Sequence, residues 1–220
     1  MKPPAARFLS FGTDPVVLAR RLLGQRLVRI ERHTRLAGRI VEVEAYLGPQ
    51  DRAAHTFGGR RTARNASMWL AGGHAYVYFT YGMHWCLNVV AGAADEGVAV
   101  LVRAIEPEEG VEAMVRHRRG GDRRLLAAGP ARLTQALAID GAFDGEDLRT
   151  SDRLFIERVL PRALPARRIA ATPRIGVAYA GEWAAAPLRF CVADSPGLSR
   201  RLNAATCWSG PRSADRLDVR

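Results

Sequence analysis

Residues 39–46, Arg-Ile-Val-Glu-Val-Glu-Ala-Tyr, constrain the fold of this chain more than any other segment. Apolar and polar residues alternate along it, and this period of two predicts a β-strand. The period places Ile40, Glu42, Glu44 and Tyr46 on one face of the strand. If that face packs against a core, at least one glutamate must be solvated, paired or functional, because burying an unpaired charge is costly. An ordinary half-exposed strand would show the same spacing, so the pattern alone leaves open both a general base and a surface position.

Strand-like and helix-like segments alternate along the rest of the chain. Asp14 and Pro15 predict the start of a helix that runs to about Leu23 and ends at Gly24. Further helices are predicted to open at Pro107 and at Pro130. Alternating or β-branched runs predict strands at residues 26–32, 75–81, 87–91, 98–104, 174–179 and 188–192.

The domain organisation is predicted to be simple. The chain has 220 residues, with no internal repeat and no low-complexity linker, which favours one domain of mixed strands and helices. We expect residues 1–13 to form a loose, flexible arm and residues 14–195 to form the domain. Residues 196–220 form a tail whose pattern indicates no role.

The charge of the chain indicates a polyanionic partner. Lysine and arginine total 33 against 22 aspartates and glutamates, which gives a formal net charge of +11. Such a field attracts nucleic acid, although an arginine-rich proteome would produce the same excess. Lys2 is the single lysine, so no internal lysine is present to form a Schiff base.

Other functional classes lack the residues that they require. No apolar run approaches the ~20 residues of a membrane helix, and residues 1–10 contain no apolar signal segment. Cys86, Cys191 and Cys207 are odd in number, far apart and in no C-x-x-C pair, which excludes a four-cysteine cluster and argues against a zinc site. We therefore expect a cytoplasmic protein with no metal, no cofactor and no membrane partner.

The tyrosines are concentrated in one part of the chain. Four of the five, namely Tyr46, Tyr76, Tyr78 and Tyr81, lie within a short region, and Tyr76 and Tyr78 share one strand face. Flat rings of this kind can stack on a flipped nucleobase. Tyrosine is also a good strand former, so the cluster has a purely structural interpretation as well.

A basic loop follows the first of these tyrosines. It carries Arg60, Arg61 and Arg64 and lies close in sequence to His55. Its guanidinium groups can hold phosphates, and a solvated loop would have the same composition.

Recognisable motifs follow one another in a fixed order along most of the chain. They occupy residues 38–49, 51–55, 64–68, 76–83, 88, 102–107, 129–133, 174–176 and 180–183. In residues and in order, from about residue 8 to residue 195, they resemble the alkyladenine (3-methyladenine) DNA glycosylase family. The resemblance implies an α+β fold, a single compact domain around a curved antiparallel β-sheet with flanking helices.

The resemblance also implies an activity and two catalytic residues. Members of this family flip a damaged purine out of the duplex and hydrolyse its N-glycosidic bond. Glu44 matches the catalytic base that activates the attacking water, and Arg103 matches the residue that helps to hold this water. Glu42 is implied to be a supporting acid or a structural residue.

Further positions match residues of the family that contact DNA. Tyr46, His55 and Tyr78 match a pocket that sandwiches the flipped base, with Tyr76 in a supporting place. Asn88 matches a residue that crowds the exocyclic amine of guanine, and Tyr81 matches the side chain that fills the gap in the duplex. The implied partner is double-stranded DNA with damaged purines, bound by a monomer at a bacterial nucleoid.

Two alternatives remain at this level. A non-catalytic nucleic-acid-binding module of related fold would bind without releasing a base and would not depend on Glu44. A hydrolase of another glycoside would use Glu42 and Glu44 as its carboxylate pair, because neighbours at i and i+2 on a strand lie ~6.5–7 Å apart at Cα.

Overall fold

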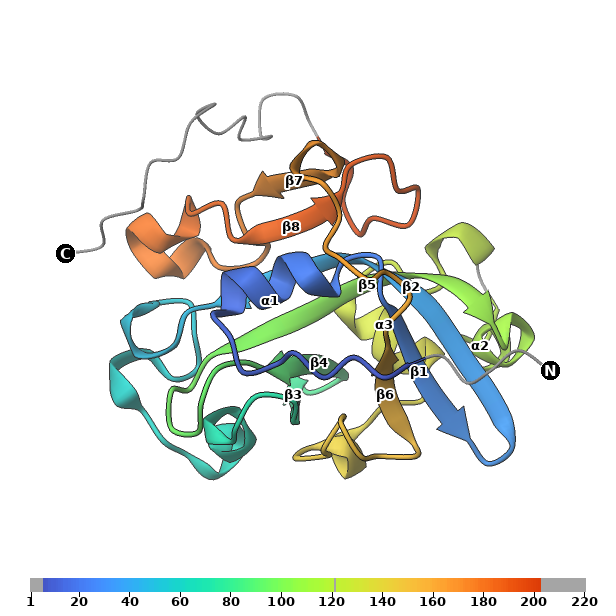
Figure 1. Cartoon of the computed structure of the whole chain (residues 1–220), viewed down its shortest axis with the longest axis horizontal. Coiled ribbons are helices and arrows are strands. Elements are labelled where there is room, and N and C mark those ends of the chain that lie inside the picture. Colours follow the sequence, from blue (N-terminus) through green and yellow to red (C-terminus); the bar gives the residue numbers. More distant parts are fainter. Residues whose placement is uncertain (1–5, 121, 203–220) are drawn as a thin grey trace.

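The long strand β2 (Thr34–Tyr46) organises the computed structural model, which describes residues 6–120 and 122–202 (Figure 1). On one side β2 pairs with β5 (Ala99–Glu109) over most of its length. On the other side it pairs first with β1 (Arg26–Glu31) and then with β8 (Arg189–Val192). β2 therefore joins two parts of the sheet that are far apart in sequence.

The remaining strands extend the sheet from these partners. Its main path runs β3 (Ala75–Thr80), β4 (His84–Val90), β5, β2, β1 and β6 (Leu154–Glu157), and β8 also pairs with β7 (Ile169–Thr172). The pairings between these strands are antiparallel. The predicted α+β class with an antiparallel sheet is confirmed.

Strand periodicity gives the central strands two different faces. One face contributes apolar side chains to the main core, such as Val43 and Ala45 from β2. The opposite face, called the site face below, carries polar and aromatic side chains and one leucine: Glu42, Glu44, Tyr46, Tyr76, Tyr78, Asn88, Leu101 and Arg103. Because neighbouring residues on a strand point to opposite faces, a single alternation builds both the core and the site.

A β-bulge limits the predicted shared face of β2. The register between β2 and β5 shifts on both sides of Glu42. Ile40 packs in the main core together with Val43 and Ala45, so the prediction that it shares a face with Glu42 is wrong. The extra residue of a bulge reverses the direction of the side chains that precede it.

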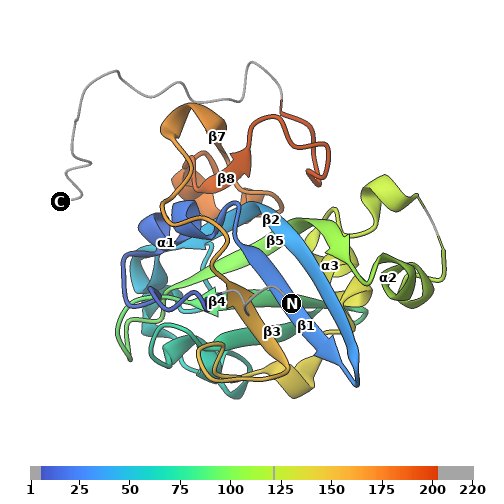
Figure 2. The same cartoon turned by 45° about the vertical axis from the view of Figure 1, so that its right-hand side comes forward.

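The helices cover the sheet through their apolar sides. α1 (Pro15–Leu22) begins at Asp14, whose side chain accepts hydrogen bonds from the amides of Val16 and Val17 at 2.8 and 3.0 Å, as predicted. It packs on β2 and β5, whereas α3 (Pro130–Ala136) packs on β4 and β5 and α2 (Val111–His117) packs on α3. α1 and the α2–α3 pair lie on opposite sides of β2 and β5 (Figure 2).

Several short 3₁₀ helices lie in the connections. Their bounds are Gly48–Gln50, Phe57–Gly59, Ala63–Trp69, Arg123–Leu125, Gly141–Phe143, Ala166–Arg168 and Ala178–Ala184. None of the described helices is long and apolar enough to cross a membrane.

Two predicted elements differ from the structure. The helix predicted to open at Pro107 is wrong, because β5 continues to Glu109 and pairs with β2 as far as Ala37. Salt bridges of Glu108 with Arg26 and Arg39 reinforce this extended conformation, and the helix starts only after Gly110, whose φ is 70°. A helix prediction made from consecutive residues takes no account of these partners on another strand.

The strand predicted at residues 174–179 is also wrong. Strand β7 lies earlier, at Ile169–Thr172, and residues 174–179 form a loop that leads into a 3₁₀ helix. The backbone of this loop turns toward the site face, where the amide of Ile175 donates to Glu44 at 2.8 Å. The Ile175 amide is therefore hydrogen-bonded to a buried carboxylate and not to a neighbouring strand.

The two ends of the described chain are packed. Residues 6–13 differ from the expected loose arm, because Phe8 and Phe11 are buried in the main core with their rings 5.0 Å apart. At the other end, Leu198 packs against the same core, beyond the predicted domain boundary at residue 195. Residues 1–5 and 203–220, including Cys207, lie outside the described residues.

Phe11→Ala should lower the free energy of unfolding by about 3–5 kcal/mol, because it leaves a cavity in the core. Chemical denaturation measures this loss. Leu9→Ala is the matched control, since Leu9 is 62% exposed, and it should change stability by less than about 0.5 kcal/mol. Equal, small effects of the two changes would mean that this segment is a loose arm after all.

Candidate active site

A cavity of about 310 Å³ opens on the site face of the sheet. Its walls come from β2, β3, β4 and β5, from the loops around Ala53 and Ile175, and from the start of α3. All five tyrosines of the chain line it: Tyr46, Tyr76, Tyr78, Tyr81 and Tyr179. The cavity therefore combines the tyrosine cluster predicted from sequence with one tyrosine from a distant segment, in a volume typical of small-ligand pockets.

His55, Tyr76 and Tyr78 form one aromatic wall. The Nδ1 atom of His55 lies 2.7 Å from the hydroxyl oxygen of Tyr76. The His55 ring meets the Tyr78 ring edge-on, with their centroids 4.6 Å apart, and the guanidinium of Arg64 lies 5.2 Å from the centre of the Tyr78 ring. The predicted grouping of His55, Tyr76 and Tyr78 is thus present in the structure.

This wall is uncharged at neutral pH. Burial lowers the pKa of His55 to about 4, and the positive charges of Arg64 and Arg60 act in the same direction. Burial also raises the pKa values of the Tyr76 and Tyr78 hydroxyls. The surface that a ligand meets here is therefore neutral and aromatic.

Glu44 lies directly behind the cavity wall. Its side chain is fully buried, and it accepts hydrogen bonds from the Tyr46 hydroxyl at 2.9 Å and from the Ile175 amide at 2.8 Å. Nη1 of Arg103 lies 3.3 Å from its Oε1 atom. Tyr46, Ile175 and Arg103 all line the cavity, so the three partners of Glu44 connect this carboxylate to it.

Glu42 occupies a different environment two residues earlier. It accepts hydrogen bonds from Nε of Arg103 at 2.9 Å and from Nε of Arg189 at 2.7 Å, and Ser199 adds two more donors. Burial alone would raise the pKa of Glu42, but the charges of Arg103 and Arg189 hold it below its ordinary value. The hydrogen-bonding capacity of Glu42 is thus used within the protein, by two arginines and by Ser199.

Asn88 and Tyr81 lie at opposite depths of the cavity. Asn88 is buried on β4 and donates its side-chain amide to the Tyr76 carbonyl at 3.0 Å. Tyr81 is 82% exposed at the tip of the β3–β4 hairpin, with a φ of 52°, and Gly82 follows with a φ of 66°. The turn carries its aromatic ring out into solvent at the mouth of the cavity.

The three arginines of the predicted basic loop have separate surroundings. Arg64 lies over Tyr78, whereas Arg61 stacks on the Trp69 ring at 4.0 Å and pairs with Asp95 at 2.8 Å. Arg60 is exposed and has no salt bridge with any other residue in the described parts of the chain. A role for all three as a phosphate clamp stays a prediction.

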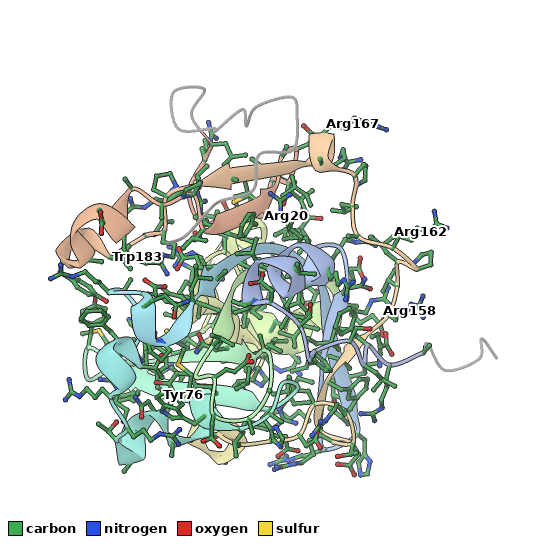
Figure 3. All side chains as sticks on the ribbon, turned by 60° about the vertical axis from the view of Figure 1, so that its left-hand side comes forward. Arg20, Tyr76, Arg158, Arg162, Arg167 and Trp183 are labelled. Carbon is green, nitrogen blue, oxygen red and sulfur yellow. The ribbon has the colours of Figure 1, made fainter. Side chains whose placement is uncertain are left out.

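A second group of arginines lies elsewhere. Arg158, Arg162 and Arg167 are exposed along one edge of the molecule, well apart from Tyr76 and Trp183 in Figure 3. The positive charge of this protein is therefore not confined to the cavity side.

Sequence analysis missed a buried pair that supports the cavity. Asp51 and Arg174 are joined by two hydrogen bonds, one of them 2.8 Å long, and both side chains are fully buried. The Arg174 guanidinium also lies 4.8 Å from the centre of the Tyr46 ring. Both residues fall within the quoted motifs, but 123 positions separate them, so no local pattern could pair them.

Other missed residues are Tyr179, Arg189 and Ser199. Tyr179 is 69% exposed at the cavity mouth, and the other two contact Glu42. Tyr179 is the one tyrosine outside the sequence cluster, and residue 199 lies in the segment whose sequence pattern indicates no role. Among residues 6–120 and 122–202, no three histidine, cysteine, aspartate or glutamate side chains are grouped as a metal site would require.

The fold and cavity define an α+β protein with an aromatic-walled pocket, and comparison with known proteins identifies its family. Residues 9–196 match the family described as methylpurine-DNA glycosylase (MPG). The chain is 48% identical over 200 residues to DNA-3-methyladenine glycosylase of Mus musculus, an alignment that covers 86% of this chain and 59% of the mouse protein.

Bacterial relatives match along more of their length. The chain is 43% identical to a putative 3-methyladenine DNA glycosylase of Koribacter versatilis (strain Ellin345), covering 86% of this chain and 90% of the relative. For the corresponding protein of Bacillus cytotoxicus (strain DSM 22905 / CIP 110041 / 391-98 / NVH 391-98) the identity is 42%, with 85% and 95% covered. This chain belongs to the methylpurine-DNA glycosylase family.

The low pKa of His55 predicts a pH dependence of folding. Between its ordinary value of 6.5 and about 4, the unfolded chain binds a proton at His55 that the folded chain does not bind. The free energy of unfolding should therefore fall as the pH decreases through this window, and His55→Asn should make the fall shallower. Denaturation of both proteins at pH 7.5, 5.5 and 4.5 measures it, and parallel curves would contradict the assignment.

Proposed function

We propose that this protein is a monofunctional DNA glycosylase that removes alkylated or deaminated purines and so initiates base excision repair. The observation that carries the proposal is the five-tyrosine cavity with the buried Glu44–Arg103 pair behind its wall. Membership of the methylpurine-DNA glycosylase family supports the same substrate class.

The cavity wall suits a flipped purine. Tyr46, Tyr78 and His55 offer neutral ring surfaces and edges, on which a flat base gains stacking energy. Asn88 occupies a buried place beside Tyr76, where it can exclude a base that carries an additional exocyclic amine. A purine that is already weakened by damage costs less to unstack, which favours lesions over normal bases.

Tyr81 is suited to occupy the gap that the flipped nucleotide leaves. Its exposed ring projects from a tight hairpin, and an aromatic wedge restores part of the lost stacking. The net charge of +11 and the exposed Arg60 favour binding to the phosphates of the DNA backbone. We expect the protein to bind DNA as a monomer, in the cytoplasm at the bacterial nucleoid.

Glu44 is suited to act as the general base. As a carboxylate it removes a proton from a water held between itself and Arg103, and the water oxygen forms a bond to C1′ of the sugar. The bond between C1′ and the base nitrogen breaks, and its electron pair leaves with the purine. The Tyr46 hydroxyl and the Ile175 amide fix the carboxylate in place, so that it does not rotate away from the reacting water.

Water is the expected nucleophile because the chain has one lysine, Lys2, near its start. A glycosylase that cleaves the strand through an amine forms a Schiff base that borohydride traps. No such adduct is expected here.

Glu44→Gln should lower the single-turnover rate of base release at least about 100-fold, because the amide cannot accept the proton from water. The rate is measured by alkali-dependent cleavage of duplexes that carry one hypoxanthine or one etheno-adenine. Binding of the same duplexes should persist. Glu112→Gln is the matched control, since Glu112 is exposed and pairs with Arg123. This variant should release bases at the wild-type rate.

The same assay tests the alternative of a non-catalytic binding module. If the wild-type protein binds these duplexes and alkylated DNA but releases no base from either, the protein is a binding module and not an enzyme. Unchanged base release by Glu44→Gln would reject Glu44 as the base.

Tyr81→Gly should reduce excision from duplex DNA about tenfold while leaving excision from single strands nearly unchanged, because only the duplex has a gap to fill. Glycine accepts the positive φ of this position, so the fold should remain intact. Single-turnover rates on paired and unpaired oligonucleotides make the comparison. Equal losses on both substrates would place Tyr81 in base binding and not in gap filling.

A further inference from the structure

Glu42 is a buried carboxylate beside the cavity for which the proposed chemistry has no use. Its Oε1 atom accepts from Nε of Arg103, from Nε of Arg189 at 2.7 Å and from the hydroxyl of Ser199 at 2.7 Å. Its Oε2 atom accepts from the amide of Ser199 at 2.6 Å. Ser199 therefore supplies as many hydrogen bonds to Glu42 as the two arginines together.

The same contacts fix the guanidinium of Arg103. Its Nε donates to Glu42 at 2.9 Å, its Nη1 lies 3.3 Å from Glu44, and its Nη2 donates to the hydroxyl of Ser199 at 3.4 Å. The serine hydroxyl thus accepts from Arg103 and donates to Glu42. All three nitrogens of Arg103 have a partner, and the position of this side chain at the cavity depends on Glu42 and Ser199 as well as on Glu44.

The segment that carries Ser199 is docked by its own contacts. We call residues 195–202 the C-terminal strap. The hydroxyl of Ser195 donates to Glu106 at 2.5 Å, and Nη2 of Arg189 donates to the carbonyl of Arg200 at 3.0 Å. At Gly197 an added Cβ would come within 3.0 Å of Glu106 Cγ. The strap therefore lies close against β5, and this brings Ser199 to Glu42.

The negative charges of two glutamates balance the positive charges of two arginines in this cluster. Glu42 and Glu44 face Arg103 and Arg189, and all four side chains are buried. Glu42 has two guanidinium partners and Glu44 has one, so Arg103 is shared between them. A neutral donor and acceptor such as Ser199 can set the direction of this shared arginine without changing the charge balance.

We propose that Ser199 is a positioning residue for base excision, which acts through Glu42 to hold Arg103 toward Glu44 and the cavity. This inference rests on the proposed function for its catalytic consequence. Ser199 is then part of the active site, although it is distant in sequence from every residue that faces the cavity on β2 to β5.

Substitutions at two serines of the strap test the proposal. Ser199→Ala removes the hydroxyl between Arg103 and Glu42 and should lower the single-turnover rate of base release about tenfold, with affinity for the same duplex unchanged. Ser199→Thr retains a hydroxyl and should restore most of the rate. Ser195→Ala is the control, because its hydroxyl contacts Glu106 and not Glu42. The hydrogen bond from Arg189 to the Arg200 carbonyl still docks the strap in this variant, so its rate should match the wild type.

The outcomes separate positioning from simple stability. A slow Ser199→Ala beside a normal Ser195→Ala, at temperatures where both are folded, supports the proposal. Equal losses in both variants would mean that the strap acts only through stability, and a normal rate for Ser199→Ala would overturn the role of its hydroxyl.

A second measurement does not require enzymatic activity. The Nε–H signal of Arg103 in the nuclear magnetic resonance spectrum, assigned through its loss in Arg103→Lys, reports the hydrogen bond to Glu42. Its hydrogen exchange should be slow in the wild type and in Ser195→Ala and faster in Ser199→Ala. If the wild type releases no damaged purine, the proposed function fails, and this exchange still decides whether Ser199 positions Arg103. Unchanged exchange in Ser199→Ala would overturn the proposal.

Discussion

Burying two carboxylates on one face of β2 is the constraint on which the rest of this structure depends. Glu42 and Glu44 are both fully buried, and each needs cationic and hydrogen-bonding partners to offset the loss of water. Arg103 from β5, Arg189 from β8 and Ser199 from the C-terminal strap supply them. The need to supply partners to these two carboxylates therefore determines where three distant segments pack.

The same cluster gives different surroundings to two glutamates that look equivalent in sequence. Glu42 is held by two arginines and a serine, and these charges keep its pKa low despite burial. Glu44 shares Arg103 and has in addition the Tyr46 hydroxyl and the Ile175 amide as partners, all from residues that line the cavity. The two acids therefore have different surroundings although their side chains are identical, and in the proposed function Glu42 orders the site while Glu44 acts on the water.

The aromatic wall of the cavity is uncharged, also because of its surroundings. Burial and nearby arginine charges keep His55 neutral at physiological pH, and burial keeps the tyrosine hydroxyls protonated. In a protein with a net charge of +11, this creates a neutral, ring-lined pocket within a positive surface. In the proposed function the positive charge would attract the polyanion and the neutral pocket would select the flat base.

The sequence by itself predicted β1 to β5 and β8, the first and third helices and most of the cavity wall, because periodicity and capping are local properties of consecutive residues, but it missed β6 and β7. It also grouped Tyr76 and Tyr78 on one face, and its ordered motifs led to the family that the comparisons confirm. Only the tertiary structure decided the contact of Glu42 with Ser199, the pairing of Asp51 with Arg174 and the approach of Tyr179 to Ala53, since these contacts join segments more than 100 residues apart. It also decided that β5 extends past Pro107 and that the N-terminal phenylalanines are buried, because the partners that stabilise them lie on other strands.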